Sequence, residues 1–299
     1  MGITINDVRF LLNAKREGVS FKRTITLGRL QWFVKQAALE VEVGKHGIAS
    51  AGLGEDAFTG GYCEPFFTSL GAERVDSMDV SDYEHATVLH DMNQPLPDRL
   101  KSAYSVVFDG GTLEHIFNFP QAIRNCMDMV AVGGHFLGCC PANNEMGHGF
   151  YQFSPELWFR VFSPENGFEM QHVLIYAHHG GDRYGDWYEV ADPQQVRSRV
   201  TLVNQKPAYL LIQAKRTELK PLFTTTPQQS DYQATWAAMQ SERETGHVQG
   251  GLLKRFYRAI VPRSWRDVLY RFRRNTRPAR HTHDLGVIDT RHFKRFGPD

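Results

Sequence analysis

Cysteine is scarce in this chain of 299 residues, and its four cysteines form no C-x-x-C pair. The sequence therefore predicts neither a disulfide framework nor a zinc ribbon, and we expect reduced thiols in a cytoplasmic protein. Long apolar runs are also missing, because residues 1–18 mix Asp, Arg and Lys with the apolar positions. That start is typical of neither a signal peptide nor a membrane span.

The chain has no large excess of positive or negative charge, since its formal net charge is +1. The basic residues are, however, unevenly distributed. Residues 251–280 carry ten Lys or Arg residues against a single acid, Asp267. Apolar residues recur among these charges at helical spacing, so the segment is interpreted as a helical basic extension that contacts an anionic membrane surface. The plainer alternative is a helical pair docked on the core, and nucleic acid is the less favoured partner.

Short apolar runs that end in Gly, Asp or Asn alternate with amphipathic stretches. We expect strands at 23–28, 74–81, 86–93, 104–111 and 133–142, helices at 29–42, 64–72 and 119–130, and late strands at 169–177 and 208–216. Buried runs of this kind are typical of parallel strands covered on both faces. The pattern predicts an α/β, Rossmann-like, doubly wound and mostly parallel sheet with a late antiparallel strand.

Three regions are expected along the chain. An N-terminal helical segment, 1–22, precedes the Rossmann-like domain at 23–216. The composition turns polar after Arg216, so residues 217–299 are predicted to form a linker and the basic extension.

Five sequence motifs follow one another at the expected strand ends: "VDSMDVSDYE", "HDMNQPLP", "FDGGTLEHIFNFPQAIRN", "GGHFLGCCPAN" and "FYQFSPELWFRVFSPENGF". In this order, residues 23–216 resemble the class I methyltransferases that depend on S-adenosylmethionine, especially those with Leu-Glu-His after the fourth strand. The resemblance implies a cofactor site where the carboxyl ends of neighbouring strands converge.

The resemblance also implies roles for single residues. Asp79 would hold the ribose hydroxyls of the cofactor, and Asp91 with Met92 would border its adenine. The turn at Gly28 would pass beneath the cofactor, and its methionine side would be lined by Gly110, Gly111, Thr112 and His115. Alternatively, the two aspartates only cap turns, which is a common use of Asp at strand ends.

The first turn departs from the pattern of the family. It holds a single glycine, Gly28, followed by Arg29, whose charge would repel a sulfonium unless the side chain is turned away or paired with a carboxylate. Ser105 stands where many relatives have an acid. These departures favour the alternative of a non-catalytic relative that serves as a binding or scaffold protein in a membrane-associated assembly.

Methyl transfer to a hydroxyl needs a base, and the candidates are His148, Asp109 and His115. His148 is favoured because flanking glycines place it in a loop after the fifth strand, and because the pKa of histidine, about 6.5, suits proton removal near neutrality. An acceptor with several hydroxyls would be oriented by neighbouring polar side chains, namely Asn143, Tyr151 and Gln152.

No metal site is predicted. His178 and His179 are adjacent on an extended segment and would point to opposite sides, even with Asp182 nearby. The histidines of "RHTHD" at 280–284 lack an evident third ligand.

These features predict a methyltransferase that uses S-adenosylmethionine to methylate a hydroxyl of a sugar or a lipid-linked glycan precursor. The expected location is the cytoplasm, at the inner face of a membrane. Nucleic-acid methylation is disfavoured because the chain has no Asn-Pro-Pro-Tyr type of signature, for which "PANN" is a poor substitute.

Overall fold

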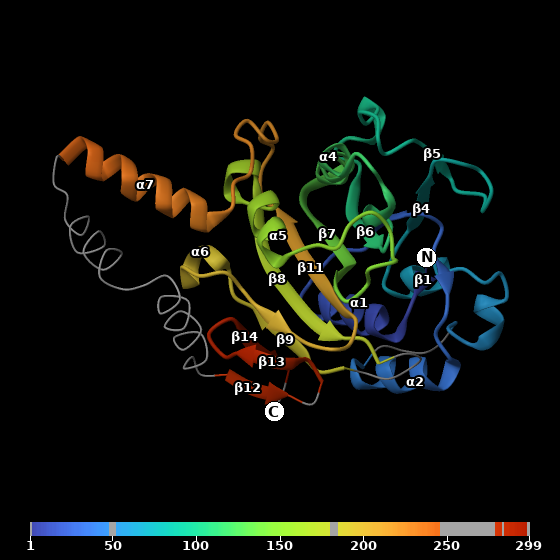
Figure 1. The fold of residues 1–299 in the computed structure, drawn as a ribbon. Coiled ribbons are helices and arrows are strands. Elements are labelled where there is room, and N and C mark those ends of the chain that lie inside the picture. The colour runs from blue at the N-terminus through green and yellow to red at the C-terminus, as the bar shows by residue number, and fades with distance from the viewer. Residues whose placement is uncertain (1, 48–51, 180–184, 246–278, 283, 298–299) are drawn as a thin grey trace.

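The computed structural model describes residues 2–47, 52–179, 185–245, 279–282 and 284–297. Its centre is a nine-stranded sheet (Figure 1). In chain order these strands are β2 (Arg23–Leu27), β4 (Arg74–Asp79), β5 (Val88–Leu89), β6 (Tyr104–Gly110), β7 (Val130–Asn143), β8 (Phe168–Ala177), β9 (Trp187–Val190), β11 (Ala208–Arg216) and β14 (Phe293–Phe296).

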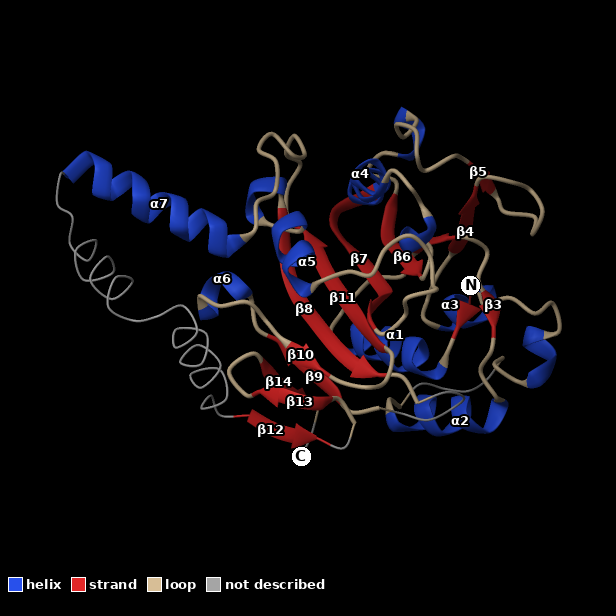
Figure 2. Cartoon of the chain, viewed as in Figure 1, coloured by secondary structure: helices blue, strands red, loops and turns tan. Residues whose placement is uncertain are grey.

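Helices and two small sheets surround this sheet (Figure 2). The α-helices are α1 (Ile5–Arg16), α2 (Gln36–Lys45), α3 (Glu64–Ser69), α4 (Phe119–Met129), α5 (Pro155–Val161), α6 (Pro193–Val196) and α7 (Ser230–Thr245). The small sheets pair β1 (Gly2–Ile3) with β3 (Gln31–Trp32), and β13 (Gly286–Asp289) with β10 (Leu202–Val203) and β12 (Ala279–Thr282). Short 3₁₀ turns include η3 (Leu113–His115) and η4 (Pro164–Asn166).

The strand order confirms the predicted fold class. Strands β5, β4, β2, β6 and β7 are parallel neighbours in that order, which is the 3-2-1-4-5 arrangement of a doubly wound sheet. The late strand β11 lies antiparallel between β7 and β8, as the sequence predicted. The order reverses between β2 and β6, so the switch point lies at the carboxyl ends of those two strands.

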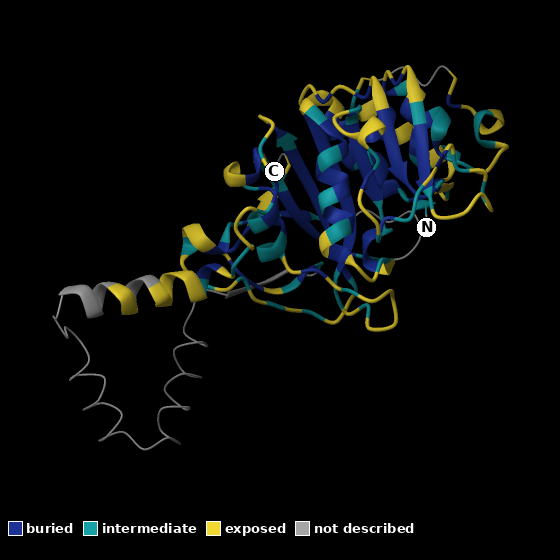
Figure 3. Ribbon diagram, turned by 90° about the horizontal axis from the view of Figure 1, so that it is seen from above, coloured by how far each residue is buried: buried dark blue, intermediate teal, exposed yellow. Residues whose placement is uncertain are grey.

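Two apolar clusters cover the two faces of the sheet. One contains α4 and α5 together with alternate strand residues such as Val107 and Phe136. The other contains α1, α2 and α3 together with the intervening residues, such as Phe108 and Leu137. Because neighbouring strand residues point to opposite faces, this alternation explains the nearly continuous apolar runs. Figure 3 shows the buried strands between these layers.

The segment after β2 differs from the expected helix at 29–42. Residues 31–32 instead form β3, which pairs in parallel with β1, and α2 begins only at Gln36. Leu30 is buried, and the ring of Trp32 stacks on that of Phe58 with centroids 4.1 Å apart. Pairing with the N-terminal strand thus overrides the helical spacing, and no helix begins at Gly28 to offer its N-terminus to a ligand.

The C-terminal region is more than the expected linker and extension. Strand β14 pairs with β9 at the edge of the central sheet, and Leu285, Ile288 and Phe293 are buried in the core. Helix α7 is largely exposed over its first turns and lies at one side of the molecule (Figure 3). Most of the predicted membrane-contacting segment, 251–278, lies outside the described residues. Among the helices that are described, none combines the length and apolarity of a membrane span.

Candidate functional site

The strand ends at the switch point bring three predicted cofactor residues to one edge of the sheet. Leu27 lies in register with Met78 on one side and with Asp109 on the other, so Gly28, Asp79 and Gly110 follow at the same level. The amide of Gly28 donates to the carbonyl of Met78 at 2.7 Å. The first part of the predicted constellation is therefore assembled.

The two strand-end aspartates are both engaged in their own turns. Oδ1 of Asp79 accepts the amide of Ser81 at 3.1 Å. Oδ1 of Asp91 accepts the amide and the side-chain nitrogen of Asn93 at 2.9 and 2.8 Å, and these hydrogen bonds hold the pKa of Asp91 below its usual value. The turn-capping alternative thus accounts for both residues, while within the described part of the chain Oδ2 of Asp79 accepts no hydrogen bond.

Gly110, which is predicted to line the methionine side of the cofactor, is covered by a neighbouring side chain. A Cβ at this position would lie 2.7 Å from Cδ1 of Leu30, so the side chain of Leu30 fills the space above the glycine. Gly111 has φ of +93°, and the hydroxyl of Thr112 donates to the carbonyl of Leu27 at 2.8 Å. These contacts close the turn after β6 onto β2.

Arg29 is paired with a carboxylate, as a sulfonium nearby would require. Its Nε donates to Oε1 of Glu64 at 2.6 Å, and its guanidinium donates to the carbonyl of Glu84 at 3.1 Å. The guanidinium carbon lies 3.9 Å from the ring centroid of Tyr62. The side chain is therefore held against the start of α3 and the loop after β4.

The side chain of Met92, which is predicted to border the adenine together with Asp91, is packed into the core. It is 6% exposed and belongs to the cluster beneath α4. The fully buried amide of Asn125 donates to the carbonyls of Met92 and Gln94 at 3.2 and 2.8 Å and so anchors the loop after β5. Asn125 was not among the predicted site residues, although its place on the apolar face of the helix, three residues after Ala122 and four before Met129, was a usable signal.

Asp109 is fully buried, which contradicts its candidacy as a base. Its Oδ1 accepts the amides of Thr112 and Leu113 at 2.8 and 3.3 Å. Burial raises its pKa to about 7. An acceptor from solvent does not reach this carboxyl group, so Asp109 holds the turn on which the next residues stand.

Glu114 organises the loop that carries His148. The carbonyl of Glu114 accepts the amides of Phe150 and Tyr151 at 2.7 and 3.2 Å. Gly149 has φ of +68°, and a Cβ there would lie 2.7 Å from the same carbonyl oxygen. The glycine after His148 therefore lets the loop approach closely enough to place Nε2 of His148 at 3.3 Å from Oε1 of Glu114.

The resulting cluster joins Glu114, His115 and His148. Glu114 is 1% exposed, whereas both histidines are exposed, and their rings lie 4.9 Å apart between centroids. Burial, and next the charge of Asp109, raises the pKa of Glu114 to about 8. Burial, and next the neighbouring His148, lowers the pKa of His115. Sequence analysis named both histidines but gave Glu114 no role in the site.

The three side chains predicted to orient the acceptor each make a hydrogen bond within the protein. Asn143 donates to Oδ1 of Asn204 at 2.7 Å, and the hydroxyl of Tyr151 donates to the carbonyl of Phe117 at 2.6 Å. Oε1 of Gln152 accepts the amide of Glu145 at 2.9 Å. Each of these polar groups is used to shape the surroundings of His148.

The histidines after β8 are separated from this cluster in sequence and in their contacts. Nε2 of His179 lies 3.2 Å from Oδ1 of Asp284, and Nδ1 contacts Nζ of Lys206 at 3.0 Å. The ring of His178 lies against Tyr209, with centroids 5.6 Å apart. Asp182 lies outside the described residues.

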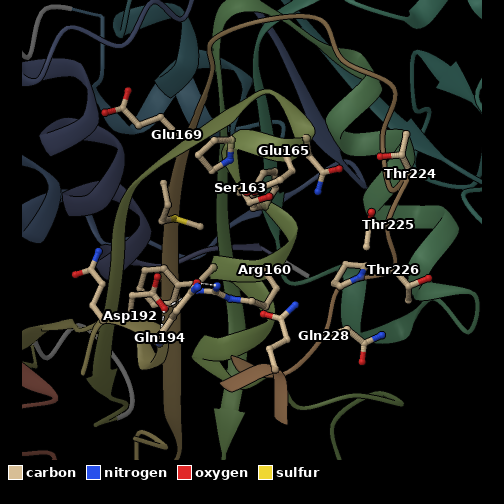
Figure 4. Close-up of a pocket in the computed structure, with 18 residues that line it drawn as sticks. Arg160, Ser163, Glu165, Glu169, Asp192, Gln194, Thr224, Thr225, Thr226 and Gln228 are labelled. Atoms are coloured by element: carbon tan, nitrogen blue, oxygen red, sulfur yellow. Dashed lines mark hydrogen bonds and ion pairs between the residues drawn. The ribbon is translucent and has the colours of Figure 1, made fainter. Parts of the chain in front are cut away.

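A separate cavity of about 530 Å³ lies between α5, η4, α6 and residues 224–228 (Figure 4). Arg160 lines the cavity and forms ion pairs with Asp192 and Glu156, with nitrogen–oxygen distances of 2.5 and 3.4 Å. The described residues that line it include none of the predicted cofactor or catalytic residues. This cavity is therefore independent of the strand-end site.

Comparison with known proteins yields matches among solved structures. No protein-family model matches the sequence, and no curated protein matches it. The matched structures include a proposed methyltransferase from Bacillus halodurans (10% identity, TM-score 0.39, 69% of this chain and 99% of that one). They also include an S-adenosylmethionine-dependent methyltransferase from Mesorhizobium loti (15%, 0.34, 69% and 95%) and a branched-chain polyamine synthase from Thermus thermophilus (13%, 0.35, 75% and 61%). Likeness at this level does not extend to activity or ligand.

Proposed function

We propose that this protein is a methyltransferase that uses S-adenosylmethionine to methylate a hydroxyl group. The observation that carries the proposal is the register at the switch point. It sets Gly28, Asp79 and Gly110 side by side, with the Glu114–His148 pair on the next loops. Ligands of doubly wound sheets bind at this place, so the resemblance in sequence and the geometry agree.

The residues fit the ribose end of S-adenosylmethionine better than its methionine end. Asp79 is partly exposed beside Gly28, and a carboxylate there suits a ribose diol. The space above Gly110 is filled by Leu30, so cofactor binding on that side requires the side chain of Leu30 to move. When bound, the cofactor supplies an electrophilic methyl group.

His148 is the residue that would take the proton of the acceptor hydroxyl. Its side chain is 43% exposed, which lets an acceptor reach Nδ1, while Nε2 faces the buried carboxyl group of Glu114. The carboxyl group of Glu114 lies 3.3 Å from Nε2, so it orients the imidazole with Nδ1 toward the acceptor.

The acceptor proposed from the sequence is a sugar or a lipid-linked glycan precursor. One feature supports an acceptor that carries an apolar part. Phe117 and Phe150 are 74% and 66% exposed beside the cluster, with ring centroids 5.9 Å apart. An exposed aromatic pair next to a proton acceptor suits a ligand with an apolar part adjoining its hydroxyl groups.

Calorimetric titration of the whole protein with S-adenosylhomocysteine tests the proposal. We expect binding by the wild-type protein and at least about tenfold weaker binding by Asp79→Asn, because the ribose would lose a charged acceptor. Asp91→Asn is the matched control and should bind like the wild type, since Asp91 is committed to its own turn. A folded protein that gives no heat at millimolar ligand would remove the methyltransferase proposal.

The second candidate is a non-catalytic scaffold with the same fold, and Leu30 favours it. A buried leucine above Gly110 is what a sheet that no longer admits a cofactor would contain. The same titration separates the two functions, because a scaffold of this kind would not bind S-adenosylhomocysteine in either variant.

We propose in addition that the basic segment 251–280 holds the protein at an anionic membrane. The support is its charge and its apolar spacing. A variant with Arg271, Arg273 and Arg274 changed to Gln should sediment less with liposomes that contain phosphatidylglycerol, because each lost charge weakens attraction by about 1 kcal/mol. The control removes three exposed lysines elsewhere, Lys22, Lys101 and Lys220. Equal loss in both variants would contradict a role specific to the segment.

A further inference from the structure

We propose that Glu114, His115 and His148 together hold a divalent transition-metal ion. One ligand atom of each residue lies within 4.8 Å of the other two. Two imidazoles and one carboxylate are a donor set that suits Zn²⁺, Fe²⁺ or Co²⁺ and leaves coordination positions open on the exposed side. The sequence alone predicted no metal, because His148 is distant along the chain from the Glu-His pair.

The buried carboxyl group points to a ligand independently of the two histidines. Oε2 of Glu114 is inaccessible to solvent and has no hydrogen-bond partner among the described residues. Burying a carboxyl oxygen without a partner costs free energy. Other buried side chains, such as that of Asp109, also have an unpartnered oxygen, but the carboxyl group of Glu114 faces two exposed imidazoles as well. Coordination of a cation by this carboxyl group supplies a partner, and the adjacent imidazoles complete the donor set.

The backbone around the cluster is arranged to keep the donors together. Glu114 and His115 are neighbours in η3, and the loop with His148 is bonded to the carbonyl of Glu114 through Phe150 and Tyr151. Ligand atoms around a tetrahedral Zn²⁺ lie about 3.4 Å apart, from bond lengths of about 2.1 Å. Both imidazoles are exposed, so their side chains can rotate to shorten separations of up to 4.8 Å by about 1.4 Å without moving the core.

For the acceptor, the inference rests on the proposed function. Two neighbouring hydroxyl oxygens of a sugar could occupy the open positions of the cation. The cation would lower the pKa of a bound hydroxyl, whose proton would pass to solvent water. His148 would then act as a metal ligand, and the role of free base described above would belong to the metal-free protein. The acceptor class would narrow to compounds with two adjacent oxygens.

The test is a titration of the chelator-stripped, full-length protein with Co²⁺, followed by visible absorption. We expect one equivalent to bind with the absorption bands of a nitrogen- and oxygen-ligated ion. We also expect at least about tenfold weaker binding in both His115→Ala and His148→Ala, since each loses one of three ligands. Glu114→Gln should lose the same bands, and the two exposed histidine variants keep the test valid if the buried change prevents folding.

Controls separate this site from the other histidines, because the chain has 13 histidines in all and two of them belong to the cluster. His85→Asn removes an exposed histidine outside the cluster, in a left-handed conformation that Asn tolerates, and should bind Co²⁺ like the wild type. Equal affinity in wild type and His148→Ala, or no bands at millimolar Co²⁺, would overturn the inference. Neither result depends on S-adenosylhomocysteine, so failure here is distinguishable from failure of the proposed function.

Discussion

The acids after β4 and β5 are used differently from the acid in the turn after β6. Asp79 and Asp91 accept hydrogen bonds from the turns that follow them and keep contact with solvent. Glu114 is buried, and one of its oxygens has no hydrogen-bond partner in the described part of the chain. Folding requirements explain the first two residues, whereas they leave the third unexplained.

This difference shows which kind of observation marks a functional group. An acid at a strand end is common because turns need acceptors, so its presence says little about a ligand. A buried carboxyl group with an unsatisfied oxygen lowers the free energy of unfolding, and a function that uses the group is a natural reason to keep it. The stronger evidence for a chemical role therefore lies between β6 and β7. On the methyl-donor side of the candidate site, the question is whether Leu30 closes the space above Gly110.

The largest expected effect on stability concerns the methyl-donor side of the candidate site, where Leu30 packs over Gly110. Gly110→Ala should lower the free energy of unfolding by about 1–3 kcal/mol, because the new methyl group meets Leu30 at 2.7 Å. Leu30→Ala alone should cost about 2–5 kcal/mol through the cavity that it leaves. When Leu30→Ala is already present, adding Gly110→Ala should lower the free energy of unfolding by clearly less than it does in the wild-type protein. Urea unfolding of the four proteins measures the coupling.

Gly44→Ala is the control for that cycle. It lies within α2, has no heavy atom within 4 Å of the added Cβ, and should be neutral or slightly stabilising. If Gly110→Ala costs the same with and without Leu30, the leucine does not close the space, and the donor side is open as the sequence suggested.

The parallel sheet could be predicted because its signal is local. Runs such as those of β6 and β7 are apolar on both faces and end in Gly, Asp or Asn, so each could be recognised without knowing its neighbours. The segment 29–35 could not be predicted, because its conformation depends on pairing with β1 at the other end of α1. For the same reason, β14 was not expected to join β9, which precedes it by about a hundred residues.

The candidate site divides in the same way. His148 could be singled out from its flanking glycines, and the structure explains one of them through the contact of Gly149 with Glu114. Glu114 could not be assigned a role, because its value depends on burial and on a loop that returns from β7. The burial of Asp109 and of the Met92 side chain was not expected for a related reason, since residue types alone do not tell which side of a strand end or loop faces the core.

A smaller expected effect is the pH dependence of stability that comes from the buried carboxyl group of Asp109. Burial raises the pKa of Asp109 to about 7, above the value of 3.8 for an unperturbed Asp. The folded state therefore holds a proton that the unfolded state has released, and stability falls as the pH rises from about 4 through 7. The slope from one such group is at most about 1.4 kcal/mol per pH unit. Asp109→Asn keeps the acceptor oxygen for the amides of Thr112 and Leu113 and should flatten this slope.

Urea unfolding at steps between pH 5 and 8 measures that slope. The variant also removes a charge that raises the pKa of Glu114, so both carboxyl groups should contribute less to it. Asp91→Asn is the matched control, because the pKa of this exposed residue is lowered by its turn and it stays ionised throughout the window. If wild type and Asp109→Asn lose stability equally between pH 5 and 8, Asp109 is not the source of the pH dependence.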